Sequence, residues 1–430
     1  MYARISYTRG ELGPILRFAG GPEAEWPCGL FRTLRFVLLP MLTTRDANAL
    51  RLVCKELKRE VEEHPWEDME TVIQGYVGAR VGEREWQRGA WRACFPRARG
   101  ANVGQWGWTV RQNPKGRCTP VVDADFVHFV GLRALDMSNC RQVTDAAFVH
   151  LQGIEKLDMW GCNQDTITDA AFVNLRGIHS LKMYCCSQPT ITDAAFANLH
   201  GIHTLNMSSC NQPTITDAAF ANLAGIHTLN MRDCNQPAIT DAAFSNLAGI
   251  HTLNMSRCNQ RTITDAAFAH LTGIHTLDMW GCNQETITDA AFANLAGIHE
   301  LQMSYCYQRT ITDAAFVHLA GIHTLKMSSC YQDTITDAAF ANLRGIHTLN
   351  ISQPLSWYPS DPKMNITDAA FANLAGIHTL DMSFCNQDTI TDAAFANLLG
   401  IRTLYMENCR KALVAAARAR GLPVKDRSKT

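Results

Sequence analysis

The feature that most restricts how this chain can fold is a unit of 24 residues that recurs along most of its length. One copy, TITDAAFANLAGIHTLNMRDCNQP, occupies residues 214–237, and close variants precede and follow it. Self-similarity at a fixed period of this size is typical of stacked repeat proteins. The repeat therefore takes priority over a domain count based on the 430 residues of the chain.

Each unit contains the pattern of one short strand. In one copy Ile202, Leu205, Met207 and Cys210 form the series I-x-x-L-x-M-x-x-C. The alternation of apolar and polar residues between Thr204 and Met207 is that of a half-buried strand. One strand per unit is therefore predicted.

A short helix is predicted in the second half of each unit. Thr216 can cap a helix with its hydroxyl group, and Asp217 places a negative charge in the first turn. Phe220 and Leu223 lie three residues apart on one face, and Gly225 can end the helix in the left-handed conformation. Each unit thus corresponds to strand, turn, helix and turn.

A single unit of this size cannot bury its apolar side, so the units are expected to stack into a solenoid with a continuous core. The predicted fold class is α/β. At ~4.8 Å per strand, the parallel sheet should be slightly more than about 50 Å long. Twelve strand segments are predicted, and they start at Leu132, Ile154, Ile178, Ile202, Ile226, Ile250, Ile274, Ile298, Ile322, Ile346, Ile377 and Ile401.

The repeats of residues 121–410 resemble leucine-rich repeats of the cysteine-containing subclass, on the I-x-x-L-x-M-x-x-C pattern and the Ile-Thr-Asp that follows. The resemblance implies a horseshoe with the parallel sheet on its concave face and short helices on its convex face. One unit departs from the pattern, with Ile351 for Met and Pro354 for Cys. An insertion then carries Trp357 and Tyr358, and we expect it to bulge from the rim.

Residues 28–66 have the apolar periodicity of helices, with Thr44 or Asp46 as predicted caps. This stretch resembles an F-box, a helical module that docks on the Skp-type adaptor of cullin-based ubiquitin ligases. The matching residues are Val37-Leu38, Leu42, Asp46, Val53-Cys54-Lys55 and Trp66. The resemblance implies adaptor contacts through Val37, Leu38, Leu42, Leu50 and Val53.

The ends of the array are expected to be capped, because an open stack exposes core and strand edges. Residues 67–120 are predicted to form a linker and an N-terminal capping coil. Residues 411–421 are predicted to form an Ala-rich capping helix, followed by a basic, disordered tail to residue 430.

Three columns of the repeat could suggest chemistry, and all three are interpreted as structural. The Cys column has no paired spacing for a metal and no single thiol beside a base. Histidines from His179 to His378, one per unit, would stack in line without converging on an ion, and their protonation near about pH 6 is predicted to loosen the array. The Thr-Asp pairs are predicted helix caps. No cofactor, metal site or enzyme activity is predicted.

Positions that point from the strands into the concavity change between units, and we predict that they contact a partner protein. Aromatic and Arg side chains are the types that anchor interfaces. Neutral drift on a solvated surface is the alternative. The predicted contact residues, with the two in the insertion, are Trp160, Tyr184, Arg232, Arg257, Trp280, Tyr305, Trp357, Tyr358, Phe384 and Tyr405; Lys182, Asp233 and Lys326 also vary.

Charge and hydropathy exclude two classes of partner. Residues 121–410 hold 14 Lys and Arg against 26 Asp and Glu, a balance that does not favour nucleic acid. No apolar run approaches the ~20 residues of a membrane span, and the first residues do not resemble a secretory signal. One Cys per coil would be open to cross-linking in an oxidising compartment, so we expect the protein in the cytoplasm or nucleus.

The sequence favours a non-catalytic substrate receptor that links an unknown target protein to a Skp and cullin ubiquitin ligase. A second hypothesis remains open, because no Leu-Pro precedes Val37 and Leu57 stands where the F-box family often has Trp. In that case the N-terminal module would serve only as a cap, and the repeats would sequester a partner without ubiquitin.

Overall fold

The computed structural model describes residues 39–51, 55–73, 75–77, 88–105, 117–353 and 364–425. The chain divides into two compact units, Met1–Cys162 and Asn163–Thr430. The division falls inside the array of repeats. Each unit is described by itself.

Every coil of the array has the predicted order of strand, turn, helix and turn. In one coil of the second unit, β7 (Thr204–Asn206) is followed by α10 (Asp217–Phe220) and the 3-10 helix η6 (Ala221–Leu223). Each of the twelve predicted starts is followed two residues later by a strand, β4 to β15. The predicted solenoid is confirmed.

The helices begin and end as the capping residues predict. The Thr216 hydroxyl oxygen accepts a hydrogen bond from the Ala218 N–H at 3.2 Å, and Thr216 itself is extended. Gly225 has φ +81°, the left-handed conformation that allows the chain to turn back toward the next strand. The α-helical part spans only one turn before it tightens into 3-10 geometry.

The core is a stack of identical layers. Leu205, Met207, Cys210, Ile215 and Phe220 are each fully buried, and the same columns are buried in the coils on either side. Neighbouring strands pair in parallel and in register, so that Leu205 lies opposite Leu229. Like residues therefore lie next to like along most of the second unit, with Ile351 in place of Met in one coil, which gives the continuous core that one coil cannot form.

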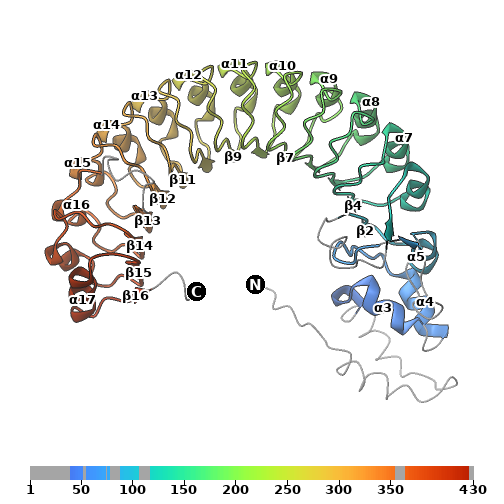
Figure 1. Ribbon diagram of the computed structural model, residues 1–430, viewed down its shortest axis with the longest axis horizontal. Helices are drawn as coiled ribbons and strands as arrows, with labels where there is room; N and C mark the ends of the chain where they lie inside the picture. Colours follow the sequence, from blue (N-terminus) through green and yellow to red (C-terminus); the bar gives the residue numbers. More distant parts are fainter. Residues whose placement is uncertain are drawn as a thin grey trace, which may run out of the picture. The chain divides into compact units, whose positions relative to one another are not determined.

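In the second unit, strands β6 to β16 follow one another in sequence order along the inner side of the arc, and the helices lie outside them (Figure 1). The strands are β6 (Ser180–Lys182), β7, β8 (Thr228–Asn230), β9 (Thr252–Asn254), β10 (Thr276–Asp278), β11 (Glu300–Gln302), β12 (Thr324–Lys326), β13 (Thr348–Asn350), β14 (Thr379–Asp381), β15 (Thr403–Tyr405) and β16 (Val424–Lys425).

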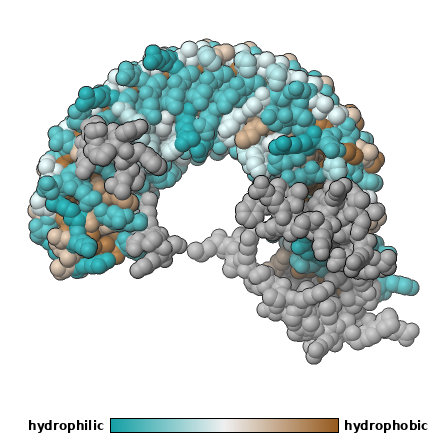
Figure 2. Space-filling model, in the orientation of Figure 1, coloured by the Kyte–Doolittle hydropathy of each residue, from teal (hydrophilic) through white to brown (hydrophobic). Residues whose placement is uncertain are grey.

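The helices of this unit are mostly single turns, and the surface around them is largely hydrophilic (Figure 2). The α-helices are α8 (Asp169–Phe172), α9 (Asp193–Phe196), α10, α11 (Asp241–Phe244), α12 (Asp265–Phe268), α13 (Asp289–Phe292), α14 (Asp313–Phe316), α15 (Asp337–Phe340), α16 (Asp368–Phe371) and α17 (Lys411–Ala419). The 3-10 helices are η5 (Val173–Leu175), η6, η7 (Ser245–Leu247), η8 (Ala269–Leu271), η9 (Ala293–Leu295), η10 (Val317–Leu319) and η11 (Asp392–Asn397).

The first unit combines small N-terminal helices with the first coils. Its elements are η2 (Leu39–Met41), α3 (Thr44–Leu50), α4 (Lys55–Glu63), β1 (Gly75–Val77), α5 (Arg88–Cys94), β2 (Gly100–Asn102), β3 (Arg117–Thr119), η3 (Asp123–Phe129), β4 (Ala134–Asp136), α7 (Asp145–Phe148), η4 (Val149–Leu151) and β5 (Lys156–Asp158). Strand β2 pairs in parallel with β4, whereas β1 and β3 form an antiparallel pair.

The cap of α3 differs from the prediction. The Thr43 hydroxyl accepts the Asp46 N–H at 3.3 Å and donates to the Asp46 carboxylate at 2.8 Å. Thr43 therefore caps the helix and Asp46 completes the pair from the first turn, while Thr44 bonds instead to the Asp68 carboxylate. Two adjacent threonines cannot be told apart by sequence when either hydroxyl can cap.

The C-terminal end is closed by the predicted helix and by a strand that was not predicted. Leu413 and Ala417 of α17 are buried. Val424 and Lys425 form β16 and pair in parallel with β15, so the expectation of a disordered tail is wrong at these residues. A hydrogen-bonded edge is available there because β15 would otherwise be unpaired. The insertion with Trp357 and Tyr358 lies outside the described residues.

Candidate functional site

The last residue of most strands fixes the backbone that follows it. The Asn230 side-chain oxygen accepts the Arg232 N–H at 3.0 Å, and the Asp278 carboxylate accepts the Trp280 N–H at 3.0 Å. The same bond, from the second residue after the strand, recurs in other coils. This position therefore holds Asn, Asp or Gln in most coils for a structural reason.

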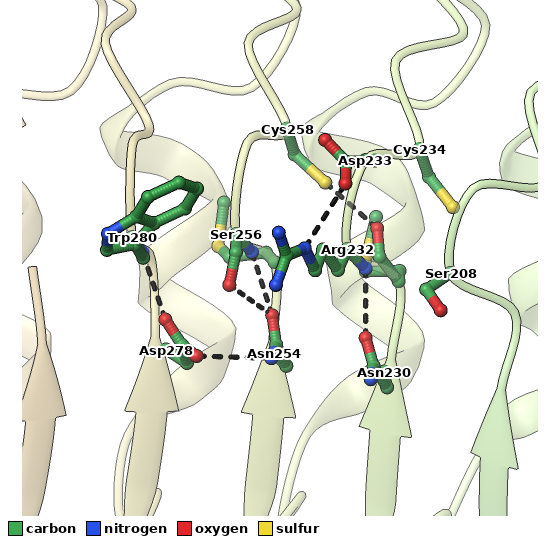
Figure 3. A network of polar contacts seen from close by, with 12 residues as sticks. Ser208, Asn230, Arg232, Asp233, Cys234, Asn254, Ser256, Cys258, Asp278 and Trp280 are labelled. Atoms are coloured by element: carbon green, nitrogen blue, oxygen red, sulfur yellow. Dashed lines mark hydrogen bonds and ion pairs between the residues drawn. The ribbon is translucent and has the colours of Figure 1, made fainter. Parts of the chain in front are cut away.

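The second and third residues after each strand form two variable columns. The first column includes Ser208, Arg232, Ser256 and Trp280, and the second includes Asp233, Arg257 and Tyr305. In Figure 3 the side chains of Arg232, Ser256 and Trp280 project from consecutive coils beside their strand ends. This geometry presents one side chain per coil on the strand side of the array.

The second variable column adopts an unusual backbone conformation. Arg257, Tyr305 and Phe384 have φ values of +56°, +61° and +63°. The conformation is set by the stack, because the N–H of each residue donates to the carbonyl of the next coil, as from Arg257 to Trp280 at 2.8 Å. Bulky residues are rare in this region of the backbone map, and such outliers cluster at functional sites.

Two arginines converge on one tryptophan. The guanidinium carbon of Arg257 lies 4.4 Å from the ring centre of Trp280, and that of Arg232 lies 5.4 Å away. Arg232 also forms an ion pair with Asp233 at 3.2 Å (Figure 3). Within the part of the chain that the structure describes, Arg257 forms no salt bridge, so it holds the unpaired cation of this cluster.

An aromatic cluster continues from Trp280 toward the end of the strands. The rings of Trp280 and Tyr305 meet edge to face at 5.2 Å, and Tyr305 and Tyr307 lie 6.3 Å apart. Tyr307 stacks on Tyr331 at 5.7 Å. We call Trp280, Tyr305, Tyr307 and Tyr331 the aromatic cluster.

Sequence reasoning missed Tyr307 and Tyr331. They occupy a column that is Asn in most coils, where Asn235 Oδ1 accepts the backbone N–H of Asn259 at 2.7 Å in the next coil. A signal was present, because two adjacent coils lose this bracing side chain and both replace it with Tyr. The structural role of the Asn column had to be known before that loss could be noticed.

A groove with a floor of serines lies beside the aromatic cluster. The first variable column holds Ser304, Ser328, Ser352 and Ser383 between the bulky Trp280 and Phe384. The Ser304 hydroxyl accepts the Ser328 N–H at 2.9 Å, and the Ser328 and Ser352 hydroxyls lie 2.8 Å apart. The groove has a volume of about 300 Å³, and its lining is completed by Gln302, Tyr305, Asn350 and Glu407.

The structure brings together part of the predicted contact set. Arg232, Arg257, Trp280 and Tyr305 form one continuous patch. Phe384 lies at the far end of the serine groove. Tyr184 is half-buried four coils before Trp280, and Tyr405 ends strand β15. Trp160 belongs to the first unit, and Trp357 and Tyr358 lie outside the described residues.

The predicted adaptor contacts are only partly described. Leu42 is half-exposed, whereas Leu50 is buried within the first unit. Val37, Leu38 and Val53 lie outside the described residues.

The Cys and His columns have the geometry of structural ladders. Cys282 is fully buried, and its thiol donates to the Met255 carbonyl at 3.1 Å. Burial raises the pKa of the Cys282 thiol to about 12, so the thiolate needed for nucleophilic chemistry is suppressed.

The imidazoles stack face to face along the second unit. The rings of His227 and His251 lie 4.5 Å apart, and in most of these coils Nδ1 lies close to the hydroxyl of the following Thr, as in His227 and Thr228 at 3.1 Å. Within residues 39–425, as far as they are described, no group of three or more potential metal-ligating side chains comes together. No helix in the same part of the chain is long and apolar enough to cross a membrane.

The family comparison concerns the repeats. Residues 126–227, 165–298 and 285–413 match the family described as BspA type leucine rich repeat region. Together these ranges cover more than half of the chain, and they do not include residues 28–66. No curated protein sequence matches the chain.

Solved structures of the same architecture are distant in sequence. A chain of the Drosophila Toll–Spatzle complex aligns with a TM-score of 0.54 at 13% identity, over 76% of this chain and 47% of that one. A chain of the TLR13–ssRNA13 complex gives 0.53 at 14% identity, over 84% and 58%. An internalin from Listeria monocytogenes gives 0.51 at 19% identity, over 70% and 81%. At these identities the likeness establishes the fold alone, and this chain spans about half the length of the first chain.

Proposed function

Because this chain belongs to the BspA-type leucine-rich-repeat family, we propose that it is a non-catalytic receptor that binds a partner protein on the strand side of its second unit. The proposed contact surface comprises Arg232, Arg257, the aromatic cluster and the serine groove. Protein binding is the general role of such a scaffold, and the specific partner follows from the side chains that its coils present.

One observation carries the proposal. Arg257, Tyr305 and Phe384 have bulky side chains at backbone positions with φ near +60°, where the left-handed residues of other coils are Gly, Ser, Asn, Asp or Cys. A left-handed residue with a side chain costs about 1–2 kcal/mol, so neutral drift would favour the small residues. Arg257 and Tyr305 contact Trp280 in one patch, and Phe384 lies at the far end of the adjoining serine groove. Aromatic and Arg residues dominate binding energy at interfaces.

A comparison of matched variants tests this proposal. The full chain is used to capture proteins from a host lysate, beside a Trp280→Ala/Tyr305→Ala variant and a Val173→Ala/Val317→Ala variant. The two valines are exposed on the outer 3-10 helices η5 and η10. We expect a partner that is retained by the valine variant and lost by the aromatic variant. Equal retention by both variants would refute the proposed surface.

We further propose that the receptor links its partner to a Skp-type adaptor and a cullin ubiquitin ligase. Support comes from the F-box resemblance of residues 28–66, from the paired helices α3 and α4, and from Leu42, which is half-exposed beside them. A purified Skp–cullin fragment should bind the full chain and lose affinity for Leu42→Asp. If the wild-type chain does not bind the fragment, the ubiquitin ligase role is wrong.

A specific observation favours the alternative in which the module serves as a cap. Leu50 is buried, and Trp66 packs edge to face against Phe95 at 5.7 Å while its indole N–H donates to the Val61 carbonyl at 2.7 Å. A chain that sequesters its partner without ubiquitin would retain the partner protein and would not bind the Skp–cullin fragment. For either role we place the protein in a reducing compartment, the cytoplasm or nucleus, because a stacked column with one Cys per coil would be open to cross-linking under oxidising conditions.

A further inference from the structure

We infer that the serine groove binds an extended peptide segment of the partner, with an acidic side chain against Arg257 and a basic side chain against Glu407. This inference rests on the proposed function, since it names the chemistry that the same surface recognises. Three features carry it: the shape of the floor, the charge at each end and the distance between the ends.

The floor is shaped for a main chain with small side chains. Ser304, Ser328, Ser352 and Ser383 are the smallest residues of the first variable column in this part of the array, and they follow Trp280 directly. Their hydroxyls are fixed by bonds to one another and to the backbone, as in the bond from the Glu407 N–H to Ser383 at 3.1 Å. Ser304, Ser352 and Ser383 are buried, so the half-buried Ser328 offers the hydroxyl that is most open to an extended peptide.

Among the described residues, the end at Trp280 presents one guanidinium group without an ion pair. Arg257 is held against the Trp280 ring at 4.4 Å and forms no salt bridge within the described residues. The nearby Arg232 is partly neutralised by Asp233. The Asp278 carboxylate already accepts two hydrogen bonds within the protein, from the Trp280 N–H at 3.0 Å and from the Asn254 amide at 3.1 Å. Arg257 is therefore the group available to a carboxylate of the partner.

The end at Glu407 is negative. Glu407 is half-buried at the end of the groove and has no salt bridge within the part of the chain described here. The nearby Asp381 is buried and accepts the Ser383 N–H at 3.0 Å. Two basic residues of these coils are engaged elsewhere, since Arg410 pairs with Asp388 at 3.0 Å and Lys425 donates to Thr403. A basic side chain of the partner would complete the pair that Glu407 lacks.

The separation of the two ends fits a short peptide. Strands β9 to β15 span six steps, which at ~4.8 Å per step gives about 29 Å. An extended chain rises about 3.3 Å per residue, so roughly nine residues connect the two charges. Between them the small serines leave a hollow that an extended peptide can enter, and Trp280 and Phe384 offer apolar contacts near its ends.

A charge-reversal selection on the full chain tests the inference. A displayed library of random twelve-residue peptides is selected against the wild type, against Arg257→Glu/Glu407→Lys, and against the control Arg261→Glu/Glu285→Lys. The control residues are exposed and have the same charges, but they lie in the turns after the Cys column. The wild type and control should select an acidic and a basic residue about nine positions apart, and the reversed variant should select the opposite order. Peptides from the wild type should bind the reversed variant at least tenfold more weakly.

Two outcomes would overturn the inference, and they bear differently on the proposed function. If peptides without this charge pattern bind, or if charge reversal leaves the selection unchanged, the groove does not recognise peptides by their charge. The proposed function then still stands, provided that the Trp280→Ala/Tyr305→Ala variant loses its captured protein. If no peptide binds and the groove instead binds oligosaccharides on a glycan array, both the inference and the protein-binding function fail.

Discussion

Asp217 connects two neighbouring coils through a single carboxylate. It lies in the first turn of α10, and its two oxygens accept the N–H and O–H groups of Thr240 in the next coil, at 2.7 Å each. Thr240 in turn caps α11, since its hydroxyl accepts the Ala242 N–H at 3.2 Å. The same link runs from Asp241 to Thr264. The helix caps of the second unit therefore form one continuous chain of hydrogen bonds from Asp169 to Thr391.

Removal of one link should open the helix that follows it. We expect Asp217→Ala to lower local stability by roughly 2–3 kcal/mol, because two hydrogen bonds to a charged acceptor are lost together. Hydrogen exchange followed over residues 236–244 should become faster by at least tenfold. Asp333→Ala is the control, since its ion pair with Arg309 is exposed and should contribute about 0–1 kcal/mol. Equal effects of the two changes would contradict the role of the link.

A substitution of Tyr305 can separate the contribution of this residue to stability from its contribution to partner binding. In Tyr305→Gly the strain at φ +61° is relieved, while backbone freedom increases and the edge contact with Trp280 is lost. These effects are each about 1 kcal/mol and nearly cancel, so the unfolding midpoint should hardly change.

Affinity for the captured partner should nevertheless fall at least about tenfold, as for other aromatic anchors. Ser329→Gly, at the same backbone position in the next coil, is the matched control and should leave both quantities unchanged. A fall in stability without a fall in affinity would assign Tyr305 to the fold rather than to the interface.

Residues with a local role could be predicted from the sequence, and residues with a role between coils could not. The caps formed by Thr216 and its equivalents, and the turn at Gly225, follow from propensity within one unit. The second role of Asp217 was missed, because a bond between coils depends on the register of the stack. The left-handed backbone of Tyr305 was missed for the same reason, since its N–H is bound by the following coil.

The imidazole ladder is a property of the stack as a whole. Rings from His179 to His378 repeat at 4.3 to 4.6 Å. Shielding by the stacked neighbours and then the like charge of adjacent rings lower the pKa of His227, His275 and His323, and Glu300 partly opposes this for His275 and His323. The folded state thus takes up protons less readily than the unfolded chain does.

The array should therefore lose stability as the pH falls. A histidine whose pKa is lowered by folding contributes stability above its unfolded pKa of about 6.5, and this stability is lost below it. The thermal midpoint should be lower near about pH 5.5 than near about pH 7.5. Asp68 does not titrate in this pH range, because the pKa of its carboxyl group is held below its usual value of 3.8.

A triple variant tests the origin of this effect. His227→Asn/His275→Asn/His323→Asn should flatten the pH profile, while His270→Asn/His318→Asn, on the 3-10 helices η8 and η10, should leave it as in the wild type. A flat wild-type profile, or equal profiles for both variants, would be evidence against the ladder.

The sequence pattern predicts the outer helices but does not show where each changes from α-helical to 3-10 geometry. The pattern from Asp217 to Gly225 predicts a helix, and a helix begins at Asp217. It tightens to 3-10 geometry at Ala221, since a 24-residue coil must return to the next strand within a few residues. Spacings of three residues, such as Phe220 to Leu223, fit both helix types.

At the scale of the whole molecule, each coil of the second unit is stabilised mainly by its two neighbours, so the ends are special. Strand β15 would present a free edge with Leu404 and Met406 beneath it, but β16 pairs with this edge and α17 covers the last layer with Leu413 and Ala417. An open edge of a parallel sheet can pair with another chain. The pairing of β16 with β15 therefore removes an edge on which another chain could pair.

Deletion of residues 411–430 should make the chain associate with other copies of itself. The change exposes the β15 edge and removes the buried Leu413, whose burial alone contributes about 1.5–3 kcal/mol. We expect light scattering after size-exclusion chromatography to show dimers or larger species at micromolar concentration, with a lower thermal midpoint. Deletion of residues 426–430 alone leaves α17 and β16 intact and should match the full chain. If the longer deletion remains monomeric and equally stable, these elements do not protect the end, and the last coil must be able to close the core by itself.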